Sequence, residues 1–409
     1  MSRNPVVVTG IGVVTPVGTG RDEFWDNLLA GRSGFAPVSS FDTSAHTVHL
    51  GAEVRGFQGA DQVRNLDASR LGRASQLAIA AAHQALADAG LDSSAGLADP
   101  GRAGVSMGTT SGEPLEVERF DDFFLASDLA GMGTEFIVRY PCHVIAANVA
   151  AELGFEGSAT MIPAACAAGN YAIAHAVDLL SAGRADLMLA GGADAFSRIT
   201  YTGFARLGAI APVTCQPFDR NRKGMIPGEG AGMVVLEPLA RALARGARIY
   251  AEVAGYGLSC DAHHMTAAHP EGAGAARAME RALEVSGLNA DEVSYISAHG
   301  TGTPTNDRLE TIAVKRVFGD AARRVPISSV KSMLGHTMGA ASAIEAAVCA
   351  LAVHCDRIPG TMNLEEPDPE CDLDYVPNAA RELPVRVAMN NAYAFGGNNA
   401  SLILRKCEM

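Results

Sequence analysis

Short β-branched runs alternate with helical runs along almost the whole chain, and this alternation constrains the fold more than any other feature. The strand-like runs are bounded by glycine or proline, and several are continuously apolar, which is typical of strands covered on both faces. We therefore expect an α/β fold. The predicted strands are 6–9, 103–107, 159–162, 187–190, 233–236, 249–254, 293–297, 327–329, 385–389 and 402–404. The predicted helices are 22–29, 74–87, 144–153, 172–181, 274–286, 309–317 and 340–350.

The chain is long enough to bury a large core, with 409 residues of which 48% are hydrophobic. A boundary near residues 244–247 divides it into two halves of similar style, 1–245 and 246–409. Residues 108–143 break the alternation, because they are rich in Gly, Asp and Phe and have no clear period. A long irregular segment of this kind predicts a lid or an interface.

Composition excludes several classes of protein. The net charge is −13 and the chain has no basic run, which argues against nucleic acid as a partner. No apolar run approaches the roughly 18 residues that span a bilayer, and the first residues do not resemble a signal peptide. We therefore expect a cytoplasmic protein that does not enter a membrane. The eight cysteines are scattered without a Cys-x-x-Cys pair, so neither a zinc site nor a disulfide framework is expected.

Two motifs suggest functions that we do not favour. Residues 9–15 match part of a dinucleotide-binding fingerprint, but the third glycine is missing and Pro16 follows. We expect these glycines to let the chain turn tightly after the first strand. His263, His264 and His269 lack the spacing of a metal-binding helix, so a transition-metal site there is not expected.

Cys166 has the sequence context of a nucleophile. It lies between pairs of alanines, after a predicted strand and before a predicted helix, so its sulfur is expected near a helix N-terminus. Unpaired amide N–H groups there favour an anion, which predicts a lowered thiol pKa. A buried structural cysteine is the alternative interpretation.

Three further segments place a polar residue in a glycine-rich turn directly after a strand. They are residues 297–304, 328–337 and 390–399, and the first two contain His299 and His336. Active sites of open α/β sheets form at the carboxyl ends of strands, so these turns are expected to converge on Cys166. A cysteine with two histidines suits nucleophilic acyl chemistry, in which neutral imidazoles donate to a carbonyl oxygen.

Several long motifs occur in an order that resembles a known family. They are 8–12, the Cys166 turn, 190–193, 217–219, 228–232, 261–266, 299–303, 306–311, 331–336, 371–377 and 395–397. With these motifs the chain resembles the β-ketoacyl-acyl-carrier-protein synthases of the condensing-enzyme (thiolase-like) superfamily. It is similar to the bacterial synthase II type and to the ketosynthase chain of type II polyketide synthases. The resemblance implies two similar α/β halves in an α-β-α-β-α layered sandwich.

The resemblance also implies catalytic roles. Cys166 resembles the nucleophile that is acylated. His299 and His336 resemble the pair that drives malonyl decarboxylation and stabilises the enolate. Lys331 resembles the lysine that sets the electrostatics of that pair, and Glu310 is its expected partner.

Other residues resemble the family's binding groups. Thr301 and Thr303 correspond to threonines that hydrogen-bond the phosphopantetheine arm, and Phe395 to a gate between the acyl and malonyl pockets. The backbone N–H groups of Cys166 and Phe395 would form the oxyanion hole. Three residues resemble a monovalent-cation site that occurs in some relatives: Glu345, Asn390 and Asn391.

The implied partners are an acyl carrier protein and a second synthase-like chain. That chain is either an identical copy or a chain-length factor, and no cofactor is implied beyond the phosphopantetheine of the carrier. An acidic carrier would need a local patch of arginines on this acidic chain. The candidates are Arg70, Arg73, Arg206, Arg220 and Arg222.

The chain departs from the family pattern at three points. Ala164 stands where threonine is usual, Ala394 replaces the glycine before Phe395, and Asn398 replaces a threonine. Because alanine restricts φ, we expect a stiffer gating loop.

Alternative functions are a non-catalytic chain-length factor, a thiolase or synthase III enzyme, and a scaffold protein. Chain-length factors lack the nucleophile, and thiolases carry Asn or Cys in place of His336. The joint presence of Cys166, His299, Lys331 and His336 argues against a scaffold. The sequence does not decide whether the enzyme acts in fatty-acid synthesis or in polyketide synthesis.

Overall fold

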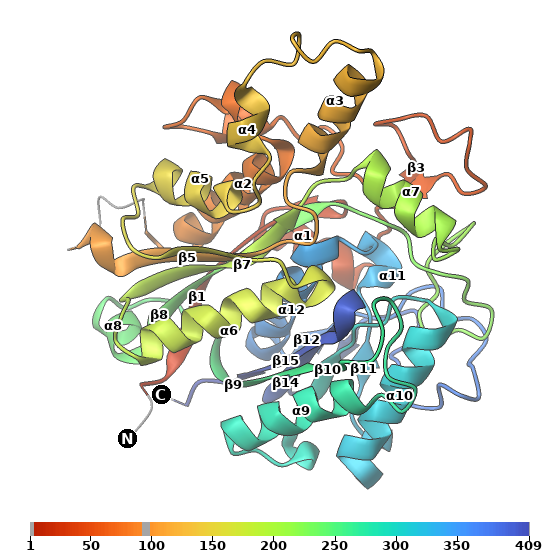
Figure 1. Cartoon of the computed structure of the whole chain (residues 1–409). Coiled ribbons are helices and arrows are strands. Elements are labelled where there is room, and N and C mark those ends of the chain that lie inside the picture. Colours follow the sequence, from red (N-terminus) through yellow and green to blue (C-terminus); the bar gives the residue numbers. More distant parts are fainter. Residues whose placement is uncertain (1–3, 92–98, 409) are drawn as a thin grey trace.

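The computed structural model describes residues 4–91 and 99–408, and one 11-stranded sheet organises them (Figure 1). Its order is β11-β10-β14-β15-β9-β1-β8-β7-β5-β6, with β2 paired to β1. All ten predicted strands are present. They are β1 (Val6–Thr15), β5 (Ala103–Gly108), β6 (Ala159–Ile162), β7 (Leu187–Asp194), β8 (Gly230–Pro238), β9 (Ala251–Cys260), β10 (Tyr295–Ser297), β11 (Ile327–Ser328), β14 (Val387–Tyr393) and β15 (Asn398–Arg405), joined by the short β2 (Gly18–Thr19).

The strand order separates the two parts of the chain. One side of the sheet consists of β1, β2, β5, β6, β7 and β8, and the other of β9, β10, β11, β14 and β15; β1 and β9 pair where the two sides meet. Each side contains both parallel and antiparallel pairs, as in β5 with β6 and β7 with β8. Parallel pairs need crossover helices, which explains the alternation in the sequence.

Helices cover both faces of each side, so the molecule has five layers. Helices α2 and α5 pack on the outer face of the first side, and α9 and α10 cover the outer face of the second (Figure 1). Helices α6 and α12 lie between the two sides and contact strands of both. The seven predicted helices are confirmed as α1 (Arg21–Leu29), α2 (Arg73–Asp88), α5 (Val144–Leu153), α6 (Ala168–Ser181), α9 (Ala273–Ser286), α10 (Pro304–Phe318) and α12 (Ala341–Cys355).

The central helix α12 belongs to a stretch that is long and apolar enough to span a membrane, which the sequence analysis did not predict. This stretch is Met338–Cys355, and its mean hydropathy is 1.6. However, 89% of this stretch is buried inside the protein. It packs against α6, β8 and β14, so its apolar character reflects its place in the core.

Residues 108–143 are more regular than predicted, because they contain the helices α3 (Pro114–Leu125) and α4 (Glu135–Arg139). Their apolar side chains do not follow a single buried stripe, since many of them face outward. Those exposed are Phe124, Leu125, Leu129, Ile137, Val138 and Tyr140.

The expectation of a tight turn at Gly10 and Gly12 was wrong, because β1 continues through both residues. The glycines allow close packing instead. A Cβ atom on Gly12 would lie 1.9 Å from the Ala81 carbonyl oxygen of α2, and one on Gly10 would lie 2.1 Å from the Ala85 carbonyl oxygen. Helix α2 therefore rests directly on the backbone of β1.

This contact predicts that Gly12→Ala destabilises the protein by about 3 kcal/mol or more, because the backbones of β1 and α2 cannot move apart without disturbing the core packing. The matched control is Gly203→Ala in helix α7 (Arg198–Arg206), where an added Cβ meets nothing within 4 Å. That control should be neutral or slightly stabilising, since alanine favours helix. Urea unfolding measures both, and equal midpoints for Gly12→Ala and the parent would contradict the account.

Candidate active site

Cys166 lies in a sharp corner between strand β6 and helix α6. A single 3-10 turn, Ala165–Ala167, joins the two elements, and Ala165 has φ of 49°. This left-handed conformation is strained for alanine, and such strain is characteristic of functional corners. The structure thus places Cys166 at the predicted strand-to-helix corner, with the residue buried at the head of α6.

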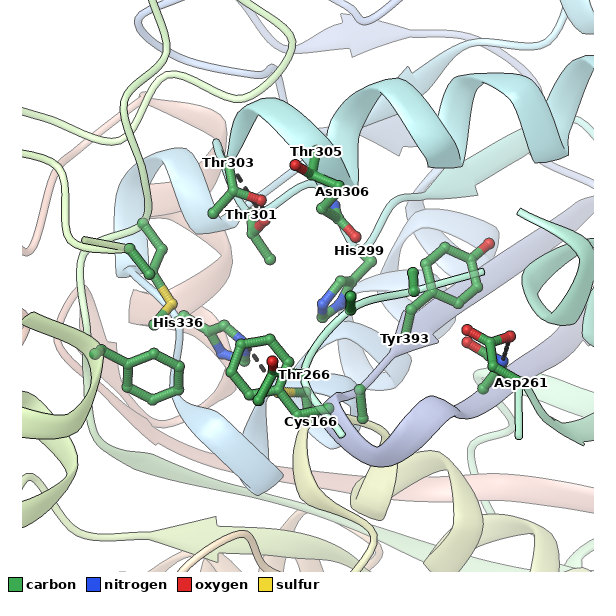
Figure 2. A pocket seen from close by; sticks show the side chains of 18 residues that line it. Cys166, Asp261, Thr266, His299, Thr301, Thr303, Thr305, Asn306, His336 and Tyr393 are labelled. Carbon is green, nitrogen blue, oxygen red and sulfur yellow. Dashed lines mark hydrogen bonds between the residues drawn. The ribbon is translucent and has the colours of Figure 1, made fainter. Parts of the chain in front are cut away.

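His336 contacts the sulfur of Cys166 directly. Its Nε2 atom lies 3.1 Å from Sγ (Figure 2). The backbone N–H of Met338 donates to its Nδ1 atom at 3.1 Å. Because that N–H can only donate, Nδ1 must carry a lone pair, so the neutral ring bears its hydrogen on Nε2. His336 therefore donates to the sulfur, and its Nε2 atom has no lone pair for a metal ion.

His299 reaches the same space from the turn after β10. One ring nitrogen of His299, one of His336 and the sulfur of Cys166 all lie within 4.8 Å of one another. The two imidazole rings meet edge to face at 5.6 Å. The backbone N–H groups of His299 and Gly300 each donate at 2.8 Å to the buried carboxylate of Glu310. Glu310 thus shapes the turn that carries His299.

Lys331 pairs with Glu345 and not with Glu310, so the predicted partner was wrong. The Lys331 ammonium donates to the Glu345 carboxylate, and both side chains are almost completely buried. Lys331 begins the short helix α11 (Lys331–Leu334), while Glu345 lies on α12. The pairing depends on how these helices pack, which the local sequence does not encode.

Burial dominates the ionisation of the site. It lowers the pKa of His299 and of His336 well below their usual value of 6.5, and the positive charge of Lys331 lowers both further. Burial also raises the pKa of the Cys166 thiol to about 12, although Lys331 opposes this shift. The expected lowering of the thiol pKa was therefore wrong, because desolvation outweighs the helix N-terminus. At neutral pH the site holds a neutral thiol and two neutral imidazoles.

A cavity of about 240 Å³ opens onto this group. Thr301, Thr303 and Phe395 line it, as the sequence predicted for substrate-binding residues, and the hydroxyls of the two threonines lie 2.9 Å apart. Figure 2 shows the threonines above the histidines and Cys166. Phe395 is 42% exposed and packs against Phe204, with ring centroids 5.8 Å apart.

The loop around Phe395 is held by the segment that starts at Asp261. The backbone N–H of Asp261 donates to Gly397, and the backbone N–H of Gly396 donates to Met265. Gly396 and Gly397 have φ of 84° and 79°, which only glycine adopts readily. Ala394 has φ of −127°, so alanine fits this conformation without strain.

Asp194 is a supporting residue that the sequence analysis missed. Its buried carboxylate accepts hydrogen bonds from the N–H groups of Thr110, Ser111 and Gly339 and from the Thr109 hydroxyl. It thereby ties the end of β5 to the loop that follows His336. Burial raises its pKa to about 6. An acidic residue directly after the apolar run 187–193 was the available signal.

The structure does not bring the three candidate cation ligands together. Glu345 is engaged by Lys331, and Asn390 donates to Asn170 and to the Ser342 carbonyl oxygen in the central layer. Asn391 faces the opposite side of β14, where it accepts from Ser401 and contacts Met279. Adjacent strand residues point to opposite faces, which explains the divergence. His263 and His264 are exposed and His269 is half-buried, and none of the three lines the cavity that contains Cys166.

Comparisons with known proteins agree with this geometry. The chain matches the family model of the β-ketoacyl synthase N-terminal domain over residues 3–242 and that of the C-terminal domain over residues 250–365. The fold and the site thus define a condensing enzyme with a thiolase-like fold. The chain belongs to the β-ketoacyl synthase family.

Individual relatives cover the whole chain. A curated 3-oxoacyl-[acyl-carrier-protein] synthase 2 from Synechocystis is 40% identical over 100% of this chain and 99% of its own length. The solved structure of the ishigamide ketosynthase/chain length factor is 44% identical, with a TM-score of 0.96 and full coverage of both chains. A type II polyketide ketosynthase bound to its acyl-carrier protein is 32% identical, with a TM-score of 0.91 over the full length of both.

The buried ion pair predicts a specific energetic coupling. A double-mutant cycle between Lys331→Met and Glu345→Gln should give an interaction energy of about 3 kcal/mol, because each single change leaves an unpaired buried group. The matched cycle between Lys331→Met and Glu310→Gln should give about 0.5 kcal/mol or less. Denaturant unfolding supplies the free energies, and a larger coupling to Glu310 would contradict the observed pairing.

Proposed function

We propose that this enzyme catalyses a decarboxylative Claisen condensation between an acyl thioester and malonyl-acyl carrier protein. The observation that carries the proposal is the buried group of one thiol and two neutral imidazoles at the end of an open cavity. A synthase needs a sulfur to hold the acyl chain and N–H donors to stabilise an enolate, and this group contains both.

In the first half-reaction the acyl group moves from the carrier's thioester to Cys166. The Cys166 sulfur attacks the carbonyl carbon, the bond to the pantetheine sulfur breaks, and the thiol proton leaves with the released pantetheine thiol. We infer that the backbone N–H groups of Cys166 and Phe395 hold the oxyanion during this step. The Nε2–H group of His336 stabilises negative charge that develops on the attacking sulfur.

In the second half-reaction the malonyl group loses CO₂, and the electron pair of the broken bond forms an enolate. His299 and His336 donate hydrogen bonds to the enolate oxygen, each through the N–H group that a neutral imidazole keeps on one nitrogen. The enolate carbon attacks the acyl carbonyl, the bond to the Cys166 sulfur breaks, and the departing thiolate takes up a proton from solvent. The product is a β-ketoacyl thioester that remains on the carrier.

Lys331 adds to the effect of burial on the protonation of this site. Its charge further disfavours protonation of either imidazole, so both rings act as neutral N–H donors to an enolate. Glu345 supports Lys331 by compensating its buried charge, and Glu310 positions His299 through two backbone hydrogen bonds. Thr301 and Thr303 are proposed to hydrogen-bond the phosphopantetheine arm, and Phe395 to gate the acyl and malonyl pockets.

The broader setting follows from the relatives. One is named a 3-oxoacyl-[acyl-carrier-protein] synthase, and another is a ketosynthase solved in complex with its type II acyl-carrier protein. We infer chain elongation in fatty-acid or type II polyketide synthesis, in the cytoplasm, with substrates carried on phosphopantetheine and no other cofactor. We also infer that residues 1–245 and 246–409 are two structurally similar halves.

The enzyme is proposed to work as a dimer with a second chain of the same fold, either an identical copy or a chain-length factor. Strand β6 lies at the edge of the sheet and is less buried than its neighbours, and Cys166 follows it directly. The exposed apolar side chains of α3 and α4 would extend that contact. An exposed edge strand and an apolar surface are both features that a partner covers.

The first test concerns the nucleophile. Cys166→Ala should abolish transfer of a radiolabelled acyl group to the enzyme, because the sulfur that forms the new thioester is absent. The matched control, Cys260→Ala, removes an exposed thiol at the end of β9 and should label normally.

His336→Ala should retain Cys166 but reduce the rate of CO₂ release from malonyl-acyl carrier protein by roughly 10²- to 10³-fold, the cost of losing one preorganised donor. Labelling of Cys166→Ala, or undiminished CO₂ release by His336→Ala, would refute these roles.

A second test concerns the dimer. The double change Ile137→Glu and Val138→Glu places two charges on the apolar surface of α4 and should convert the dimer to monomers in light scattering. The control Leu243→Glu alters an equally exposed leucine on helix α8 (Leu239–Ala244) and should leave the dimer intact. A monomeric parent protein, or a dimer that survives the α4 changes, would contradict the proposed interface.

A further inference from the structure

We propose that a basic cleft beside the active-site cavity binds the phosphate ester of the substrate's pantetheine arm; this inference rests on the proposed function. The cleft has a volume of about 240 Å³ and lies at the start of helix α10. Its walls are formed by Arg220, Arg222, Arg308 and the Pro304–Thr305 corner, with Asp368 and Glu370 at one side.

The cleft adjoins the cavity that leads to Cys166. Thr305 lines both the cavity and the cleft, whereas Thr301 and Thr303, four and two residues earlier, line only the cavity. Figure 2 shows Thr305 on the side of the two threonines that lies away from Cys166. A linear substrate that enters along these hydroxyls therefore passes Thr305 before its thioester reaches the sulfur. Its outer end then faces the cleft.

Arg222 forms the rigid floor of the cleft. It is only 6% exposed, pairs with Asp368, and donates to the carbonyl oxygens of Asp219 and Pro304. The last contact fixes the start of α10 against the loop that carries Arg220. Its charge is thus already compensated, and its role in the cleft is to hold the other groups in place.

Arg220 and Arg308 supply positive charge that no ion pair neutralises. Arg220 is exposed and Arg308 is half-buried, and no ion pair within the described part of the chain includes either guanidinium, although the charge of Arg220 contributes to the lowered pKa of Asp368. Guanidinium groups bind phosphate oxygens with two parallel hydrogen bonds, and the N-terminus of α10 adds a favourable dipole. On a chain with a net charge of −13, a cleft with two unpaired arginines indicates an anionic ligand.

The phosphate ester of the arm is the anion that this geometry favours. It is the charged group nearest the carrier protein on an otherwise neutral arm, so binding it would fix the arm's position without contacting the thioester. Loss of that contact should weaken binding of the substrate while leaving the chemistry at Cys166 unchanged.

The experiment compares acyl transfer to Cys166 from three thioesters that carry the same acyl group. These are a pantetheine thioester without phosphate, a 4′-phosphopantetheine thioester, and the intact carrier-protein thioester. The variants are Arg308→Gln and Arg220→Gln. The matched control is Arg316→Gln, which removes an arginine from the last turn of the same helix. Intact-protein mass spectrometry at several thioester concentrations gives KM and kcat for each pair.

Arg308→Gln and Arg220→Gln should each raise KM about tenfold for the two phosphate-bearing thioesters, the effect of losing one hydrogen bond to a charged group. Their kcat values, and both constants for the pantetheine thioester, should match those of the parent and of Arg316→Gln. Three results would overturn the inference. KM could rise equally for the phosphate-free thioester, it could stay unchanged for the 4′-phosphopantetheine thioester, or it could rise only for the carrier-protein thioester. If the parent enzyme accepts an acyl group from none of the three, the proposed function fails and this inference fails with it.

Discussion

The buried charge of Lys331 is the interaction on which the rest of the site depends. An ammonium without solvent is costly, and it is tolerated here because Glu345 on the neighbouring helix compensates it. From that position the charge acts on three groups at once: it lowers the pKa of His299 and of His336, and it opposes the rise in the pKa of the Cys166 thiol. Two imidazoles that stay neutral can serve as hydrogen-bond donors. Burial, reinforced for the two imidazoles by this one ion pair beneath the active site, therefore determines which species the cavity presents to a substrate.

The side chains that surround the cavity come from both sides of one continuous sheet. Cys166 follows β6 in the first side, whereas His299 follows β10 in the second. Helices α6 and α12 between them carry the corner of Cys166 and Glu345 (Figure 1). The central layer therefore also holds the proposed catalytic group. This explains why α12 is apolar along nearly its whole length, since it is buried from Ala341 to Val353, and why its single acidic residue pairs with a lysine.

Much of this arrangement could be predicted from the sequence, and the failures have physical reasons. Strands, helices and the turn positions of Cys166, His299 and His336 depend on local periodicity and glycine placement, which are visible in one chain. The partner of Lys331 was wrong because ion pairing across α11 and α12 depends on packing. The pKa of Cys166 was wrong because burial is a tertiary property. The separation of Asn390 and Asn391 was predictable, since neighbours on a strand face opposite sides.

The central claim is that His336 is a neutral donor whose hydrogen is fixed on Nε2 by the backbone N–H of Met338. Nitrogen-15 NMR of the enzyme with labelled histidine rings tests it most directly, with His336→Asn used to assign the signal. The account predicts a pyrrole-type Nε2 and a pyridine-type Nδ1 that do not change between pH 5 and 8. A doubly protonated ring in that range, or a hydrogen on Nδ1, would contradict it.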